Sequence, residues 1–266
     1  MSDILNNRKP AFTRAIVRKP APNFAEGLTT QNLGTPSYDK ALEQHEAYCA
    51  ALRQCGLELI ELPTDAAYPD STFVEDTAIL TPNCAILTRP GAPSRQGEVD
   101  SVRDVLIHYY SRLYAIQPPG TLDGGDICEA GRHFFIGISQ RTNEAGALQL
   151  AEILAGEGYT SELIDIRHTP GILHLKSGIA YLGEKRVAVI QALADHPAFR
   201  EYELLRLPPD EEYAANCVRV NEYVLMAAGY PHFQKMLDEA GYQLIVLEMS
   251  EYQKMDGGLS CLSLRF

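Results

Sequence analysis

Short runs of alternating apolar and polar residues come in pairs along this chain, which predicts β-hairpins. The first pair begins near Phe73 (FVEDTAILTPNCAILTRPG), and comparable pairs begin near Leu122, His174 and Tyr213. Pro, Gly and Asn at the joints favour tight turns, which we expect at residues 82–83, 130–131, 183–184 and 221–222. Apolar residues with a helical period predict helices over residues 38–55, 101–110, 143–156 and 231–240.

The same unit therefore recurs about every 40–50 residues, a spacing typical of propeller and array folds. The last copy, GGLSCLSLRF, ends after one strand, and the N-terminal segment FTRAIVRKP supplies its missing partner. We predict an α/β fold in which five ββαβ-like units form a five-bladed α/β propeller, closed by the N- and C-terminal strands within one domain of residues 1–266. An open α/β sheet is the alternative. Hairpins inside every unit favour the ring, because βαβ units separate successive strands by helices.

The formal net charge of −12 argues against a nucleic-acid partner, since such binding needs clustered Lys and Arg. No apolar run approaches the roughly 18 residues that span a bilayer, so we expect no membrane partner. The N-terminal sequence lacks the apolar core of a signal peptide, and we expect a cytoplasmic protein.

The six cysteines form no CxxC pair, and no Cys/His group has the spacing of a structural zinc site. We expect no metal and no cofactor. Most of the cysteines stand in apolar runs and are predicted to pack as small core residues. Cys261, which follows two glycines near the end of the chain, needs a separate account.

The polar starts of the repeated units carry most of the candidate chemistry, and in a propeller they would face one central channel. These residues are Asp70, Glu75, Asp76, Asp123, Asp126, His174, Asn216 and Cys261. A Cys, a His and several carboxylates would then meet, as a nucleophile, its acid/base and an orienting carboxylate do. Each residue alone has a plainer interpretation: the His and Cys as core residues, and Asp-Gly-Gly-Asp as a tight turn.

Carboxylates beside a thiol raise its pKa, which argues against papain-like acyl transfer, where a positive neighbour stabilises the thiolate. The difficulty disappears if the substrate itself is cationic. A guanidinium presents a planar fork of N–H donors that carboxylates match, and its charge favours a neighbouring thiolate. The residues therefore predict an enzyme that uses Cys261 on a small guanidinium compound.

Several motifs in one order, PDSTFVED, LTRPGAPSR, LDGGD, FFIGISQRTN, LHLKSG, YAANC and DGGLSCLSLRF, resemble dimethylarginine dimethylaminohydrolase, especially its short bacterial members. The likeness runs from GLTTQNLG to Phe266 and implies the five-bladed propeller of the guanidino-group-modifying (pentein-type) superfamily. It implies Cys261 as nucleophile, His174 as general acid/base and Asp123 as the carboxylate that orients His174. The residues that match substrate-contacting positions are Leu28, Asp70, Glu75, Asp76, Arg95, Arg141 and Met255.

The activity so implied is that of a hydrolase of linear amidines, which converts Nω,Nω-dimethyl-L-arginine or Nω-methyl-L-arginine to citrulline through a covalent thiouronium on Cys261. Within this resemblance Arg95 and Arg141 anchor the α-carboxylate, Leu28 lies on a mobile loop, and Met255 offers a backbone contact. The segment after Arg95 reads Gln-Gly, so a second basic residue often found there is absent. The partner is a small molecule, and a homodimer is compatible with the sequence.

Three alternatives stay open. Arginine deiminase shares the Cys/His/acid set but is usually longer, with a helical insertion for which this chain has no room. A non-catalytic propeller that binds a macromolecular partner would have little reason to combine Cys261 and His174 with the acidic cluster. An incidental metal site at Cys261 and His174 has too few ligands for a closed zinc site.

Overall fold

This computed structural model describes residues 12–266. Within them, five three-stranded sheets are connected by helices and turns. The targeting expectation rested partly on residues 1–11, which lie outside the described range. In four sheets an antiparallel hairpin is followed by a third strand that pairs in parallel with the second. Their strands are β3 (Ala78–Leu80), β4 (Ala85–Leu87), β5 (Leu113–Ala115), β6 (Ile127–Ala130), β7 (His133–Ile138), β8 (Thr160–Asp165), β9 (Ile179–Gly183), β10 (Arg186–Val189), β11 (Glu203–Arg206), β12 (Val218–Val220), β13 (Tyr223–Ala227) and β14 (Gln243–Leu247).

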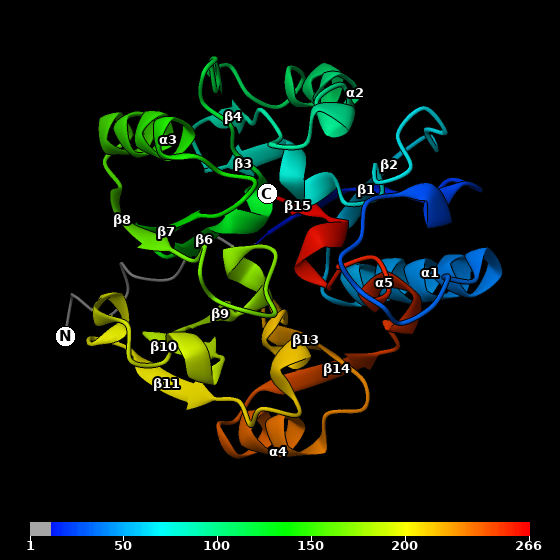
Figure 1. Ribbon diagram of the computed structural model, residues 1–266, viewed down its shortest axis with the longest axis vertical. Helices are drawn as coiled ribbons and strands as arrows, with labels where there is room; N and C mark the ends of the chain where they lie inside the picture. The colour runs from blue at the N-terminus through cyan, green and yellow to red at the C-terminus, as the bar shows by residue number, and fades with distance from the viewer. Residues whose placement is uncertain (1–11) are drawn as a thin grey trace.

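The fifth sheet joins the two ends of the chain. β1 (Arg14–Arg18) pairs antiparallel with β15 (Leu264–Arg265) and parallel with β2 (Glu58–Leu62). It repeats the pairing pattern of the other four, with its hairpin split between the termini. The predicted five-bladed α/β propeller and its closure by the terminal strands are therefore confirmed, and the five sheets stand around a common centre (Figure 1).

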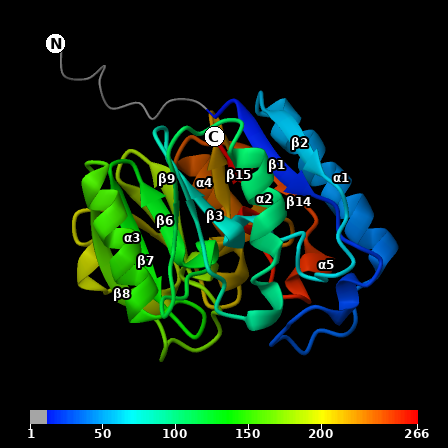
Figure 2. The ribbon, with the colours of Figure 1, turned by 90° about the horizontal axis from the view of Figure 1, so that it is seen from above.

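The longer helices lie on the outside of this ring (Figure 1). They are α1 (Tyr38–Gln54), α2 (Glu98–Leu106), α3 (Glu144–Gly156) and α4 (Pro231–Glu239), with a short α5 (Ser250–Gln253) before the last strand. α1 begins where the Ser37 side chain accepts from the Lys40 N–H, and Asn143 caps α3 by accepting from Gly146. Seen from above, α1 and α3 flank the ring on opposite sides, with β15 between them (Figure 2).

Three details differ from the sequence predictions. The second helix covers Glu98–Leu106 instead of 101–110, and its last predicted residues form hydrogen-bonded turns. The third unit has two 3-10 helices, Gln191–Leu193 and Pro197–Phe199, where the others have an α-helix, because Pro197 cannot donate to a helix that begins earlier. The turns expected at 130–131 and 183–184 lie one residue later, and positive φ angles at Glu184 and Lys185 suit such a tight turn.

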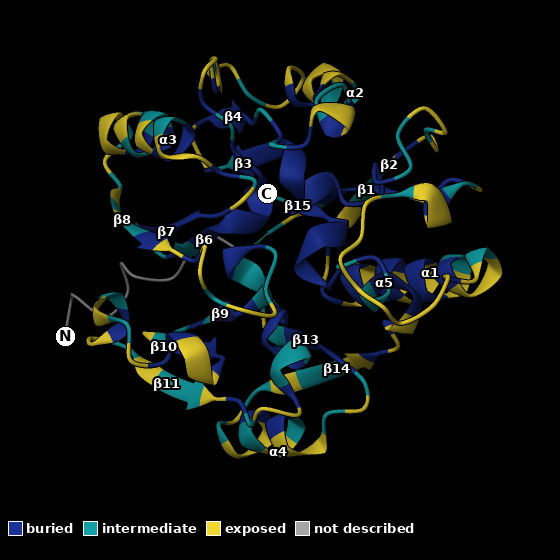
Figure 3. Ribbon diagram, in the orientation of Figure 1, coloured by how far each residue is buried: buried dark blue, intermediate teal, exposed yellow. Residues whose placement is uncertain are grey.

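Buried apolar side chains fill the space between neighbouring sheets and under the helices, while the outer faces of the helices are exposed (Figure 3). Polar residues are buried at the centre of the ring, among them Asp123, Asp126 and Arg95. Since buried polar groups need partners, a cluster of them at the centre of the ring indicates that the functional site lies there. No helix among the described residues has the length and apolarity needed to cross a membrane.

Candidate functional site

A short 3-10 turn precedes the first strand of every sheet, and neighbouring turns contact one another around the centre of the ring. The sequence predicted polar starts of these units but not their 3-10 geometry. The turns are η2 (Val74–Thr77), η4 (Gly124–Asp126), η5 (Leu175–Ser177), η8 (Glu212–Ala215) and η9 (Ser260–Leu262). Residues from distant parts of the sequence therefore meet in one place.

The glycines of the Asp-Gly-Gly-Asp segment allow this close approach. A Cβ on Gly124 would lie 2.0 Å from the carbonyl oxygen of Glu75, and one on Gly125 would lie 2.6 Å from Nδ1 of His174. Only glycine fits such gaps without displacing a neighbour. The segment is thus more than a tight turn, because it lets η4 lie against η2 and against His174.

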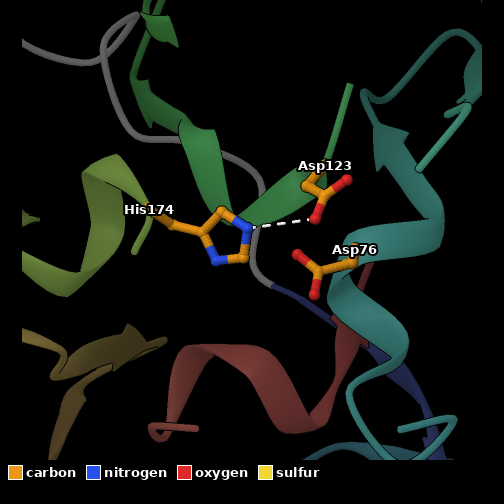
Figure 4. A group of neighbouring side chains, drawn as sticks. All are labelled: Asp76, Asp123 and His174. Atoms are coloured by element: carbon orange, nitrogen blue, oxygen red, sulfur yellow. Dashed lines mark hydrogen bonds and ion pairs between the residues drawn. The ribbon is translucent and has the colours of Figure 1, made fainter. Parts of the chain in front are cut away.

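His174 stands immediately before η5 and points toward two carboxylates (Figure 4). Its Nε2 is 3.1 Å from Oδ2 of Asp123, whose Oδ1 accepts from the Gly91 N–H at 2.8 Å. Burial disfavours the imidazolium, but the charges of Asp76 and Asp126 and the bond to Asp123 outweigh it and raise the pKa of His174 to about 9. His174 is therefore protonated at neutral pH, as a general acid needs to be.

Asp76 is held as a carboxylate by its own partners. Its Oδ2 lies 2.6 Å from Nη1 of Arg95, and its Oδ1 accepts from the Gly125 N–H at 2.8 Å. Burial alone would raise its pKa, yet His174 and Arg95 lower the pKa of Asp76 to about 2. Arg95 is itself buried and also binds Glu98 at 2.8 Å, so its position is fixed from two sides.

Cys261 lies in η9 and is buried, with Nδ2 of Asn216 3.9 Å from its sulfur. Burial and the negative charges of Glu75 and Asp76 raise the pKa of Cys261 to about 12. Without a ligand the residue is thus a neutral thiol, as the sequence argument from neighbouring carboxylates expected.

Glu75 does not line the cavity that most of the other site residues share. Its Oε1 is 2.6 Å from Nζ of Lys176 and 3.1 Å from Nη2 of Arg265, and its Oε2 accepts from Ser260 Oγ at 2.8 Å. Both carboxylate oxygens therefore have protein partners, and contact of Glu75 with a guanidinium stays a prediction.

A cavity with about 350 Å³ of empty space, its open mouth included, lies over these turns. Every residue that the family resemblance assigns to the site lines it except Asp123 and Glu75. Asp123 contacts the lining residue His174, whereas the partners of Glu75, which are Lys176, Arg265 and Ser260, also lie outside the lining. Sequence reasoning missed three lining residues, which are Phe73, Leu173 and Asp256. The fourth further lining residue, Gly257, is one of the two glycines before Cys261, where the sequence is compatible with backbone close to a ligand or with a plain turn.

A loop that begins at Leu28 forms one side of the mouth, where Leu28 is 42% exposed. Both carboxylate oxygens of Asp70 accept from the Leu28 N–H, each at 3.1 Å. Asp256 binds Thr30 and Gln31 of this loop, since its Oδ1 accepts from the Thr30 hydroxyl at 2.9 Å and from the side-chain amide of Gln31 at 2.6 Å. Burial raises the pKa of Asp70.

Within residues 12–266, Asp76, Asp123 and His174 form a group whose ligand atoms all lie within 4.8 Å of one another (Figure 4). Every carboxylate oxygen of the group already has a protein partner, and the cationic Arg95 lies beside Asp76. A divalent cation would meet that charge at close range. The donor set therefore suits a histidine between two carboxylates better than a resident metal.

The chain is similar to known proteins over nearly its whole length. Residues 29–202 match the family model described as N,N dimethylarginine dimethylhydrolase, eukaryotic. An N(G),N(G)-dimethylarginine dimethylaminohydrolase of Pseudomonas aeruginosa is 43% identical, over 96% of this chain and 100% of that protein, and one of Streptomyces coelicolor is 34% identical, over 95% and 96%. A solved structure of the Pseudomonas enzyme, a cysteine-to-serine variant complexed with citrulline, aligns with a TM-score of 0.93 at 43% identity, over 96% of this chain and 100% of that chain.

Proposed function

Because this chain belongs to the dimethylarginine dimethylaminohydrolase family, we propose that it hydrolyses Nω,Nω-dimethyl-L-arginine or Nω-methyl-L-arginine to L-citrulline. Dimethylamine or methylamine is the second product. One observation carries the proposal: Cys261 and the pair His174–Asp123 meet at one cavity that buried carboxylates surround. This combination suits a cationic planar substrate and a covalent route.

The guanidinium enters the cavity beside Asp76, whose carboxylate attracts it. The substrate charge then lowers the pKa of the Cys261 thiol, which releases its proton to solvent. The thiolate attacks the central guanidinium carbon and forms a C–S bond. As the C–N bond to the alkylated nitrogen breaks, the imidazolium of His174 gives that nitrogen a proton, and the neutral amine leaves. The product of this half-reaction is a thiouronium on Cys261.

In the second half-reaction the neutral His174 takes a proton from a water molecule, which adds to the thiouronium carbon. The C–S bond breaks, and the proton of the added hydroxyl passes to the sulfur, so that the oxygen becomes the urea oxygen of citrulline and the thiol is restored. Asp123 supports both steps, since its bond to Nε2 holds the ring and favours the imidazolium. No step in this scheme needs a metal or a cofactor.

The substrate's amino-acid head would lie toward the mouth of the cavity. Arg141 and Arg95 are our candidates for its α-carboxylate, with Asp70, Leu28 and the backbone of Met255 near its ammonium end. Arg95 already binds Asp76 and Glu98, so Arg141 is the better placed of the two to accept a new anion. This arrangement favours a free amino acid over an arginine inside a peptide.

We further infer that residues 1–266 act as one domain and that the protein works in the cytoplasm without a nucleic-acid or membrane partner. A homodimer is compatible with this function. Light scattering after gel filtration measures the mass in solution, and a mass other than that of one or two chains would contradict this inference.

Turnover of asymmetric dimethylarginine, monomethylarginine and unmethylated arginine, with citrulline as the detected product, tests the proposal. We expect citrulline from the methylated substrates in chelator-treated protein, and loss of nearly all turnover in a folded Cys261→Ser variant. Citrulline mainly from arginine would indicate a deiminase instead. Absence of citrulline from all three would leave a binding role or another guanidine as the function.

A further inference from the structure

Asp126 is a completely buried carboxylate that the mechanism above does not use. It closes η4, three residues after Asp123, and each of its two oxygens accepts a hydrogen bond. Oδ1 accepts from the Leu175 N–H at 3.0 Å, and Oδ2 accepts from Ser139 Oγ at 2.7 Å. Burial raises the pKa of Asp126 to about 6, so it is charged at neutral pH. A buried charge is costly to keep, and the partners of Asp126 show what it holds.

One arm of Asp126 reaches the turn that carries His174. Leu175 directly follows His174, so the bond to its N–H fixes the first peptide after the acid/base residue. Gly137 packs closely against both partners, since a Cβ on it would lie 2.9 Å from Cβ of Leu175 and 3.0 Å from Oδ1 of Asp126. The negative charge of Asp126 also acts on the imidazole, because it is one of the charges that raise the pKa of His174.

The other arm reaches the loop that carries Arg141. Ser139 Oγ gives its proton to Asp126 and accepts from the N–H groups of Arg141 at 2.9 Å and Thr142 at 3.1 Å. Thr142 Oγ1 in turn accepts from the Asp123 N–H at 3.1 Å. The hydroxyl of Ser139 therefore has a defined proton direction, which only an acceptor at Asp126 satisfies.

We propose that Asp126 is a positioning residue that joins the two halves of the site: through Leu175 it holds His174 in place and sustains its protonated form, and through Ser139 it sets the loop on which Arg141 meets the substrate. The proposal rests on the function proposed above. An Asn at this position is not equivalent, because its NH₂ group would face either the Leu175 N–H or a Ser139 hydroxyl whose acceptor positions are occupied.

Three variants separate the two arms. Ser139→Ala removes the acceptor of the Arg141 and Thr142 N–H groups but keeps the bond from Asp126 to Leu175, so we expect KM for dimethylarginine to rise about tenfold with kcat and its pH profile nearly unchanged. Asp126→Asn removes the charge, so kcat should fall roughly tenfold or more, and the alkaline limb of kcat/KM should move down by about one pH unit. Asp126→Glu keeps the charge with altered geometry, so it should keep the pH profile while KM rises.

A second measurement does not depend on turnover. In a Cys261→Ser background, an NMR titration of the His174 ring should give a lower pKa when Asp126→Asn is added, and an unchanged pKa when Ser139→Ala is added. Equal His174 pKa values with and without the Asp126→Asn substitution, together with only a lower melting temperature, would overturn the proposal and leave Asp126 a structural residue. If the parent protein forms no citrulline, the proposed function fails, while the ring titration still decides whether Asp126 controls His174.

Discussion

The thiol of Cys261 should ionise only when a cation occupies the cavity. Binding a guanidinium is the simplest perturbation that tests this, because it adds one positive charge without changing the protein. In the ligand-free site, burial and the charges of Glu75 and Asp76 raise the thiol pKa from 9.0 to about 12. The empty site therefore disfavours the thiolate form of Cys261, and the charge of the substrate has to lower the thiol pKa.

The expected decrease in the thiol pKa follows from the distance between the guanidinium and the sulfur. A shift of three pKa units corresponds to about 4 kcal/mol against the thiolate. A unit positive charge about 4 Å from the sulfur, at an effective dielectric constant near 20, contributes about 4 kcal/mol in its favour. We therefore expect a saturating guanidinium to lower the pKa of Cys261 by about three units. At pH 8 the thiolate fraction would rise roughly a thousandfold.

Ultraviolet absorbance at 240 nm follows the thiolate directly. We would titrate the protein from pH 6 to pH 11 alone, with saturating ethylguanidinium, and with saturating ethylurea, a neutral molecule of nearly the same shape. A Cys261→Ser protein treated identically supplies the blank, which removes the contributions of tyrosines and of the other cysteines. Ethylguanidinium should bring a new transition into the accessible range, and ethylurea should not.

Two results would refute the reasoning. If the titrations with and without ethylguanidinium coincide, the substrate charge does not activate Cys261. If ethylurea lowers the thiol pKa as far as ethylguanidinium does, then expulsion of water or a rearrangement of the site, and not charge, is responsible. In the first case the activation would have to come from a protein cation, and Lys176, whose charge lowers the pKa of Cys261, is a candidate.

Three further predictions concern the surroundings of the nucleophile. The raised pKa of His174 stabilises the folded state fully below about pH 6.5, and about 3 kcal/mol of the free energy of unfolding should be lost as pH rises through about 9; urea unfolding should show this loss in the parent and not in His174→Ala. Asp256→Ala removes the acceptor of Thr30, so KM should rise several-fold with kcat unchanged, and an unchanged KM would contradict a role of this loop in binding. Gly125→Ala would place a carbon 2.6 Å from Nδ1 of His174, so kcat should fall at least about tenfold in a protein that still unfolds cooperatively.

The blade architecture was predictable because each unit carries its own turn residues and its own alternation of apolar and polar positions. Hairpin turns need residues that adopt positive φ, and Asn221 at 55° occupies such a position between β12 and β13. The closure of the ring followed from counting, since the last unit lacks a strand and the first segment supplies one. The third unit was harder to predict, because its short connection holds two 3-10 helices, and Pro197 stands at the start of the second, where it disfavours one continuous helix.

The convergence of the site residues was predictable from the repeat, but the hydrogen bonds and ion pairs between them were not. Similar positions in successive repeats bring Asp76, Asp123, His174 and Cys261 together whatever the details of the turns. No periodicity shows that Arg95 would bind Asp76, because that contact joins a loop to the turn of the same unit across 19 residues. Such pairings depend on side-chain directions, which the alternation of apolar and polar residues does not encode.

The order of the two pKa values explains how this site restricts its own reactivity. With the Cys261 thiol near 12 and the His174 imidazolium near 9, raising the pH deprotonates the histidine before the thiol. The resting pair is therefore thiol and imidazolium, unlike the thiolate–imidazolium pair that makes other cysteine hydrolases reactive toward many electrophiles. A neutral electrophile that enters the cavity meets an unreactive sulfur. Only a ligand that brings a positive charge next to Asp76 creates the thiolate, so the carboxylates that slow ionisation in the empty site make the nucleophile selective for cationic substrates.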